Sequence, residues 1–421
     1  MRIIHTADWH LGQSFYEYSR QEEHLHFLVW LRSITRKLEI DILLIAGDIF
    51  DNPNPSAESQ KMYYSFLRDI TNENPDLQII IIAGNHDSAA RLEAPNPLLE
   101  NMNVTVRGIV SRTTNGDIDY DNLIIPLNKG GCCLAVPYLR QGDYPEAESY
   151  AKSIKLMYDI LFERTHGRSD GPVIAMGHLH ATGSVVSVND HSERIIGLEC
   201  VLPETFSENA VYTALGHLHR GQKVSGHDNV RYSGAPIPMS FAEIKNRQGI
   251  VFVEIIKGDD ENNETDIFNF SNEEDPEYIL KTEFVKFKDS VKLISIPNEP
   301  MPLFDILREI EDLPDGKITD MSPYLEIKVL LSEPEPTIRH TIENALTGKS
   351  VRLTRISATI PDHENEKENE IVTLQKLRET SPMDIAERVF EQQYGGEKMP
   401  EEMKKLLQEI IQDVEFDNHT M

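Results

Sequence analysis

The chain has 421 residues, a formal net charge of −29 and 3 cysteines. Its length predicts more than one domain, and no run approaches the roughly 18 apolar residues that span a bilayer. The acidic charge argues against a protein that coats DNA non-specifically, because such binding depends on lysine and arginine. So few cysteines exclude a disulfide framework and indicate the reducing cytoplasm. The strand-like N-terminus does not have the pattern of a cleaved signal peptide.

Strands and helices alternate along the first 256 residues, which predicts a layered α/β domain with buried strands. Strands are expected at 2–6, 41–46, 78–83, 134–136, 173–176, 211–215, 230–233 and 249–255. Helices are expected at 21–37, 57–70, 97–101 and 146–165. We therefore expect functional side chains at the ends of the strands, where open α/β sheets hold their sites.

The rest of the chain divides at acidic, weakly apolar stretches. The predicted parts are an acidic linker at 257–278, a smaller α+β cap at 279–360, a second linker at 361–380 and a helical tail at 381–421. Cap strands are expected at 284–287, 291–296, 325–331 and 351–358, with helices at 302–310 and 337–346. In the tail, an apolar stripe either packs on its own domain or docks on a partner; it comprises Met403, Leu406, Leu407, Ile410 and Ile411.

Five of the apolar runs in the first domain end in small residues followed by aspartate, asparagine or histidine. The side chains delivered in this way are Asp8 and His10, Asp48 and Asp51, Asn85 and His86, His178, and His217 with His219. A single histidine at a strand end is most often a surface or core residue. Five such ends in one chain indicate a hydrolytic site with two metal ions.

The types of residue indicate the chemistry of this site. Imidazole and oxygen donors together suit manganese, iron or zinc, and the lack of thiolates argues against a closed structural zinc. Asp48 follows a central strand, where a carboxylate can bridge two ions. His86 is placed to protonate a leaving oxygen, and Asp51 to orient His86. Two ions roughly 3.5–4 Å apart can activate water and clamp a phosphodiester.

The order of these motifs resembles the calcineurin-like metallophosphoesterases, and longer strings around Asp8, Asp48, Asn85 and Tyr232 resemble the SbcD family of nuclease subunits. The resemblance implies a layered sheet sandwich flanked by helices. It also implies two manganese ions: one held by Asp8, His10 and His219, the other by Asn85, His178 and His217, with Asp48 between them. Some relatives carry histidine where this chain has Asp51, which leaves His86 as the catalytic acid. His180 is interpreted as supporting the site without binding metal.

The resemblance further implies a DNA exonuclease and endonuclease acting in repair, recombination and replication. The chain has no P-loop motif, so any ATP dependence would come from a partner of the SbcC type, bound by the helical tail. A homodimer formed through helices of the nuclease domain is also implied, with region 92–99 contributing.

Two other functions on this fold are less well supported. One is a phosphatase or small-molecule phosphodiesterase, and the other is a non-catalytic scaffold. Phosphatases of the Ser/Thr class follow the second aspartate with Arg-Gly, whereas Asp51 is followed by Asn52 and Pro53. A non-catalytic scaffold would not need the complete ligand set. Lysines near the start of the cap either contact DNA or are simply solvated: Lys281, Lys286, Lys288 and Lys292.

Overall fold

The computed structural model describes residues 1–168, 171–184, 200–258, 278–288, 290–331, 335–359, 383, 399–400 and 403–404. The chain divides into two compact units, Met1–Ile360 and Pro361–Met421. Nearly all of the expected tail at 381–421, with most of its apolar stripe, lies outside the described residues, as do the linker at 361–380 and most of that at 257–278. Every described helix is too short or too polar to cross a membrane.

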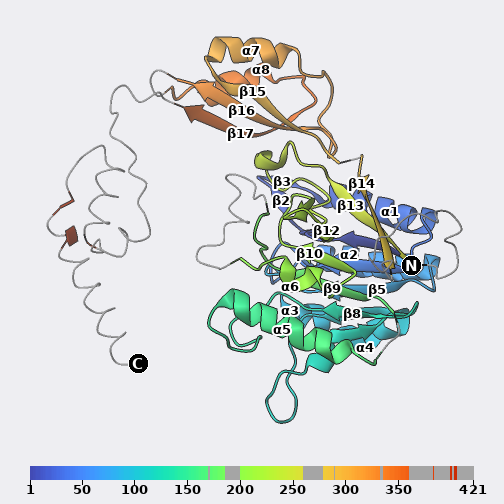
Figure 1. The fold of residues 1–421 in the computed structure, drawn as a ribbon. Helices are drawn as coiled ribbons and strands as arrows, with labels where there is room; N and C mark the ends of the chain where they lie inside the picture. Colours follow the sequence, from blue (N-terminus) through green and yellow to red (C-terminus); the bar gives the residue numbers. More distant parts are fainter. Residues whose placement is uncertain are drawn as a thin grey trace, which may run out of the picture. The chain divides into compact units, whose positions relative to one another are not determined.

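The first of two large sheets contains the N-terminal strand at its centre (Figure 1). Its order is β14 (Tyr278–Lys286), β13 (Gly249–Lys257), β1 (Arg2–Thr6), β4 (Ile42–Ala46), β5 (Gln78–Ile82) and β6 (Val104–Arg107). The strands β1, β4, β5 and β6 are parallel, and β13 and β14 are antiparallel to their neighbours. The strands β1, β4 and β5 are buried along most of their length, as expected for the centre of a sheet covered on both faces, whereas only alternate residues of the edge strand β6 are buried.

The second large sheet also has six strands, four of them parallel. Its order is β11 (Gln222–Val224), β12 (His227–Tyr232), β10 (Tyr212–Gly216), β9 (Val173–His178), β8 (Cys132–Ala135) and β7 (Ile124–Pro126). The two sheets pack face to face through a continuous apolar layer that includes Ile42, Ile80, Ile174 and Ala214. The expected α/β sandwich is confirmed.

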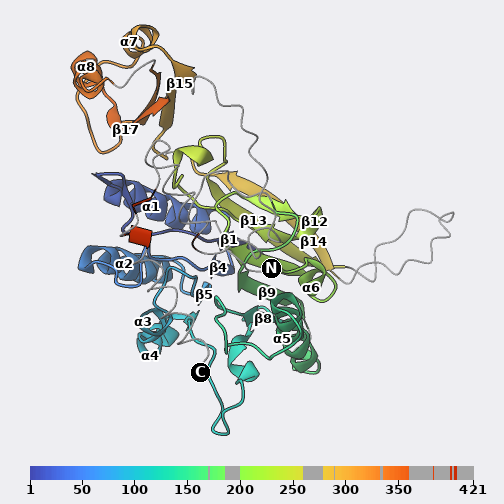
Figure 2. The same cartoon turned by 90° about the vertical axis from the view of Figure 1, so that its left-hand side faces the viewer.

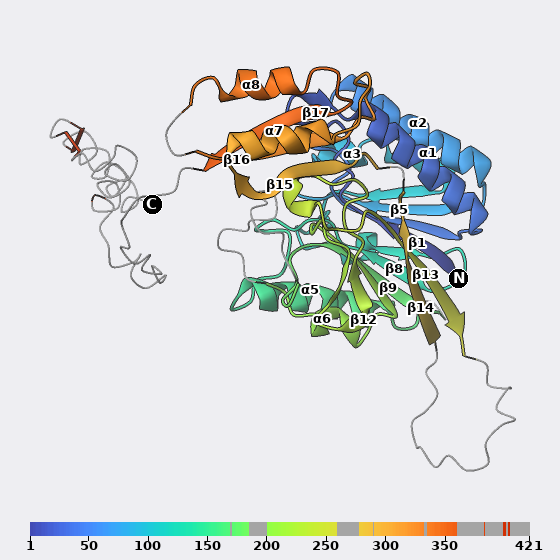
Figure 3. The same ribbon diagram turned by 90° about the horizontal axis from the view of Figure 1, so that it is seen from above.

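Helices cover the outer faces of both sheets, and Figures 2 and 3 show them on opposite sides of the strands. On the first sheet lie α1 (Gln21–Lys37), α2 (Ala57–Glu73), α3 (Ala89–Glu93) and α4 (Asn96–Leu99). On the second lie α5 (Tyr150–Thr165) and α6 (Glu204–Ser207). Ser149 accepts a hydrogen bond from the main chain of Lys152, which explains why α5 begins later than the expected residue 146.

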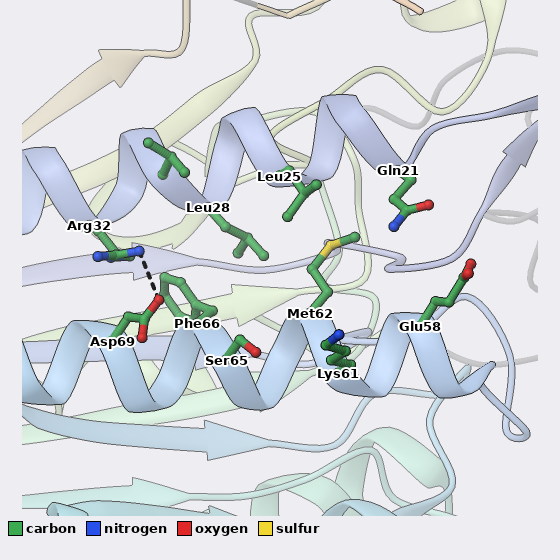
Figure 4. A pocket seen from close by; sticks show the side chains of 11 residues that line it. Gln21, Leu25, Leu28, Arg32, Glu58, Lys61, Met62, Ser65, Phe66 and Asp69 are labelled. Atoms are coloured by element: carbon green, nitrogen blue, oxygen red, sulfur yellow. Dashed lines mark hydrogen bonds and ion pairs between the residues drawn. The ribbon is translucent and has the colours of Figure 1, made fainter.

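A groove of about 310 Å³ lies between α1 and α2 (Figure 4). Its walls include the apolar side chains Leu28, Met62 and Phe66, and an ion pair between Arg32 and Asp69 spans the two helices at 3.0 Å. None of the candidate site residues lines this groove. It is therefore a feature of helix packing, separate from the candidate site.

A smaller group of strands and helices follows β14 within the first unit, and we call this group the cap. It consists of β15 (Leu293–Met301), α7 (Leu303–Glu311), β16 (Tyr324–Leu330), α8 (Ile338–Ala345) and β17 (Arg352–Thr359), with a parallel sheet ordered β15-β16-β17. The two helices pack on this sheet around Ile306, Ile327 and Ile342. The remaining short elements are β2 (Ser14–Phe15), β3 (Tyr18–Ser19), η1 (Glu100–Met102), η2 (Tyr120–Leu123) and η3 (Phe241–Glu243).

One sequence prediction about the cap is wrong. The segment 284–287 is expected from sequence to be the first strand of the cap, but it falls at the end of β14, which pairs with β13 along nine residues at the edge of the first sheet. Side chains alternate along a strand, so Lys281 and Lys286 lie on opposite faces of β14. The lysines near the start of the cap therefore do not form one basic surface.

Candidate metal centre

The residues singled out in the sequence follow the carboxyl ends of five strands. Asp8 and His10 follow β1, Asp48 follows β4, and Asn85 and His86 follow β5, all in the first sheet. His178 is the last residue of β9, and His217 and His219 follow β10 in the second sheet. Because strands within each set are parallel neighbours, their ends meet at one edge.

The structure brings these side chains together in three overlapping groups, in each of which one potential ligand atom per residue lies within 4.8 Å of the others. The groups are Asp8, His10 and His219; His10, Asp48 and His86; and Asp48, His178 and His217. An oxygen of Asp48 lies 3.7 Å from Nε2 of His10 and 3.2 Å from Nε2 of His178. Asp48 thus stands between the ligands of the two sheets.

Asn85 completes the part of the site that faces the second sheet. Its side-chain oxygen lies 3.0 Å from Nε2 of His178 and 3.0 Å from Nδ1 of His217. Nδ1 of His178 lies 2.8 Å from the carbonyl of Ala46, and the main-chain NH of His217 donates to Asp8 at 2.9 Å. These contacts cross between the two sheets, so the packing of the sandwich sets the relative positions of the ligands.

Four of the candidate ligands have left-handed backbone conformations, which are uncommon for residues other than glycine. Their φ angles are 55° at Asp8, 47° at His10, 51° at Asp48 and 101° at His217. Such conformations cost of order 1–3 kcal/mol each and cluster at functional sites. The turns after β1, β4 and β10 are therefore shaped to direct these side chains rather than for local stability.

Two glycines allow the close approach of the ligand loops. A Cβ on Gly84 would lie 2.1 Å from a carboxylate oxygen of Asp48, and one on Gly47 would lie 2.3 Å from Nδ1 of His178. Gly47 also has a φ of 93°, which disfavours any other residue. The Gly-Asp and Gly-Asn pairs of the sequence are thus packing requirements of the site.

Asp87 fixes the loops after β4 and β5 to one another. Its buried carboxylate accepts hydrogen bonds from the main-chain NH groups of Ile49, Phe50 and Gly84. Burial, together with the nearby charge of Asp48, raises the pKa of Asp87 to about 6 against these hydrogen bonds. The residue thus holds the loop of Asp48 against the loop that carries Asn85.

The electrostatics of the cluster favour a bound cation. Burial raises the pKa of Asp8, whereas His178 and His10 outweigh burial at Asp48 and hold its pKa well below the ordinary value. Burial lowers the pKa of His217 to about 3, and Asp48 raises that of His178 to about 9 against the effect of burial. A cation would compensate the buried carboxylates that these histidines neutralise only in part.

Buried polar atoms provide a direct test of whether the residues fit a metal. Oδ2 of Asp8, both ring nitrogens of His10 and Nε2 of His217 are buried and have no hydrogen-bond partner in the described part of the chain. Such atoms are rare in folded proteins because each is destabilising. Imidazole nitrogens and carboxylate oxygens are donors that divalent transition metals bind. The residues therefore fit a divalent metal centre.

His86 lies at the edge of this cluster and is half-buried. Its main-chain NH donates to Asp48 at 2.9 Å, and its ring centre lies 4.8 Å from that of His10. Its Nδ1 lies 2.9 Å from the main-chain carbonyl of Asp51. The expected contact between Asp51 and His86 is thus made by the main chain, while the Asp51 carboxylate lies 3.6 Å from Nδ1 of His10.

Sequence reasoning missed Glu243, which is fully buried in η3. Its carboxylate lies 2.9 Å from Nδ1 of His219 and accepts a hydrogen bond from the main chain of Met239. A carboxylate of this kind fixes the ring of a ligating histidine. No local motif marks Glu243.

The sequence also singled out His180. Its ring lies 3.4 Å from the sulfur of Cys200, and it belongs to none of the three described groups of potential ligands.

Known proteins with similar sequences identify the family. Residues 1–221 match the calcineurin-like phosphoesterases, and residues 290–394 match the type 5 capsule protein repressor C-terminal domain. The chain is 34% identical to the SbcD component of the SbcCD nuclease of Rhodobacter capsulatus over 86% of this chain and 88% of that protein. The chain belongs to the SbcD family. The Escherichia coli K12 member is 27% identical over 98% of this chain and 97% of its own length.

A third member of the SbcD family, from Bacillus subtilis, is 31% identical over 62% of this chain and 68% of its own length. Membership makes the chain a phosphoesterase and the nuclease component of an SbcCD complex. The family also implies divalent metal binding, in agreement with the clustered histidines and aspartates.

Proposed function

We propose that this chain hydrolyses DNA phosphodiesters with two divalent metal ions, manganese in the cell, as the nuclease component of an SbcCD-type complex in DNA repair, recombination and replication. The observation that carries the proposal is the convergence of ligand-type side chains from five strand ends, several with buried atoms that have no hydrogen-bond partner among the described residues. The SbcD relatives, which are named as parts of a nuclease, support the nucleic-acid substrate.

In this proposal, Asp8, His10 and His219 hold one ion. Asn85, His178 and His217 would hold the other, and Asp48, which lies between the two sets, would be shared by both ions. The groupings of these side chains and the position of Asp48 between His10 and His178 support the assignment. When bound, two such ions activate water and neutralise charge on the phosphate.

The chain's own residues supply proton transfer and orientation. His86 is half-buried, so its ring is accessible to substrate, and Nδ1 is engaged by the carbonyl of Asp51. In the doubly protonated ring, Nδ1–H donates to this carbonyl, and the proton on Nε2 is the one available for transfer. We propose that His86 protonates the leaving oxygen and that Asp51 positions it through its main chain.

The test is cleavage of single-stranded DNA by the purified chain with manganese. His86→Ala should lower cleavage roughly 10²–10⁴-fold while leaving manganese binding unchanged, because His86 acts on the proton and not on the metal. The exposed His166→Ala is the matched control and should cut normally. Equal cutting by both variants would contradict the role of His86. Turnover of a phosphomonoester without cleavage of DNA would favour a phosphatase.

We also propose that double-strand cleavage depends on an ATPase of the SbcC type bound by the helical tail. The names of the relatives, which describe them as subunits of a nuclease, support a partner protein. Deleting residues 383–421 should abolish binding of this ATPase and leave manganese-dependent cutting of single strands intact. Retained binding would place the docking site elsewhere.

A homodimer is the proposed assembly, formed through the region 92–99. Leu98 has 74% of its surface exposed, although its neighbours Leu92 and Leu99 are buried.

The three cysteines are free, which supports the proposed cytoplasmic location.

A further inference from the structure

We propose that a buried ion pair, Arg20–Glu23, couples docking of the cap to the geometry of two metal ligands, His10 and His219. The inference rests on the proposed metal centre and adds positioning residues to it. Arg20 and Glu23 stand at the start of α1 and are 1% and 2% exposed. Nε and Nη2 of Arg20 donate to the two carboxylate oxygens of Glu23 at 3.3 and 2.8 Å.

The cap reaches this ion pair through two of its strands. The hydroxyl of Tyr324, the first residue of β16, donates to Glu23 at 2.5 Å. Arg352, the first residue of β17, places its guanidinium 3.8 Å from the centre of the Tyr324 ring and 3.9 Å from Glu23. Both residues are at most 2% exposed. Docking of the cap therefore excludes water from the ion pair and supplies one of its hydrogen bonds.

From Arg20, one chain of hydrogen bonds leads to His219. Nη1 of Arg20 donates to the carbonyl of Pro238 at 2.6 Å. The next residue, Met239, donates its main-chain NH to Glu243 at 3.0 Å, and the other oxygen of Glu243 lies 2.9 Å from Nδ1 of His219. A ring that donates from Nδ1 has its lone pair on Nε2, the form that binds metal.

A second chain of hydrogen bonds leads from Arg20 to His10. The same guanidinium nitrogen donates to the side-chain oxygen of Gln13 at 2.8 Å, and the main-chain NH of Gln13 donates to the carbonyl of His10 at 3.0 Å. His10 has a strained backbone, with φ of 47°, so its turn depends on such support. Both series of hydrogen bonds therefore end on ligands of the same group, which consists of Asp8, His10 and His219.

The other proposed ion would not sense the cap in this way. His178 is held by the carbonyl of Ala46, and His217 and His178 both contact the side chain of Asn85. The proposal thus predicts an asymmetry: loosening the contact between cap and ion pair weakens one metal site and spares the other.

Tyr324→Phe tests this asymmetry, because it removes only the hydroxyl that donates to Glu23. Manganese binding to the full chain is measured without DNA by two-site calorimetric titration. We expect one dissociation constant to rise roughly threefold or more and the other to stay within error. Glu243→Gln, which acts directly on His219, should raise the same constant roughly 10–100-fold.

The matched control is Tyr18→Phe. The Tyr18 hydroxyl also joins the first domain to the cap, since it donates to the carbonyl of Leu353 at 3.1 Å, but the hydrogen-bond route described above does not include it. We expect unchanged manganese affinities. An equal effect on manganese affinity in both tyrosine variants would mean that the cap is loosened in general, and this would overturn the proposal. Unchanged affinities in Tyr324→Phe would also overturn it.

His219→Ala separates this proposal from the metal centre itself. Loss of one manganese ion in His219→Ala with normal binding in Tyr324→Phe would leave the metal centre standing and refute the coupling. Two ions retained by His219→Ala would instead contradict the ligand assignment. In the double variant Tyr324→Phe/Glu243→Gln, the coupling predicts that the two effects on affinity do not multiply.

Discussion

His10 combines a strained backbone with two buried ring nitrogens that have no hydrogen-bond partner in the described part of the chain. Carboxylate oxygens of Asp48 and Asp51 lie 3.7 and 3.6 Å from these nitrogens, beyond normal hydrogen-bond distance. Without a metal, both features oppose folding. With a metal, one of the two nitrogens acquires a partner, so the residue contributes to stability only in the loaded protein.

Replacing His10 should therefore change stability in opposite directions with and without metal. Asparagine tolerates the left-handed conformation better than histidine and is smaller. We expect His10→Asn to be at least as stable as the unmodified chain in EDTA, with a gain of about 1 kcal/mol. The extra stability conferred by manganese should be much reduced. Urea unfolding under both conditions measures each value.

The control is His180→Asn, since His180 is half-buried and belongs to none of the described ligand groups. It should leave the stabilisation by manganese largely intact. A clear loss of stability of His10→Asn in EDTA would show that His10 is a structural residue and would count against strain at the site.

At the scale of elements, two buried histidines link β1 and α1 to their surroundings. His5 in β1 contacts the hydroxyl of Tyr212 at 2.8 Å and the carbonyl of Leu215 at 3.2 Å, both in the second sheet. His24 in α1 lies 3.1 Å from the carbonyl of Trp9. Burial lowers the pKa of each to about 3, so both are neutral in the folded protein at neutral pH.

This predicts a specific loss of stability in acid. Below about pH 6.5 the unfolded chain takes up protons at both histidines while the folded chain does not, until about pH 3. Each should therefore reduce the free energy of unfolding by up to about 1.4 kcal/mol per pH unit as the pH falls. His24→Gln should flatten the dependence measured between pH 6.5 and 5 in EDTA. The exposed His166→Gln should not.

Local pattern predicted the elements that carry the site, because buried parallel strands appear as apolar runs and their ends carry a small residue, alanine or glycine, before the polar ligand. The helix α1 and the strand β1 have the bounds expected from sequence, and the positions of Asp8, Asp48 and His178 at strand ends followed from this pattern. Features that depend on contacts between residues far apart in the sequence could not be predicted in this way. The register of β14 with β13 and the contact of Glu243 with His219 join segments that local sequence does not relate.

At the scale of the whole molecule, the exposed Leu98 provides a test of the proposed homodimer. It belongs to α4 and has 74% of its surface exposed, whereas Leu99 beside it is 5% exposed. Single exposed leucines are common on protein surfaces, so only a measurement of self-association can show whether Leu98 lies in an interface. Burying a leucine side chain in an interface stabilises by about 1.5–3 kcal/mol, and placing a charge there is more costly still.

Leu98→Glu should therefore dissociate the proposed homodimer, with a dissociation constant at least roughly 100-fold higher because two copies of the change meet across a two-fold axis. Sedimentation equilibrium of the full chain measures it. Leu202→Glu is the matched control, because Leu202 is 55% exposed and lies beside α6, which covers the other sheet. An unmodified chain that is monomeric would contradict the proposed homodimer. A Leu98→Glu chain that remains dimeric would show that α4 does not form its interface. Cleavage of short single strands should persist in the monomer, since every proposed ligand of the metal centre comes from one chain.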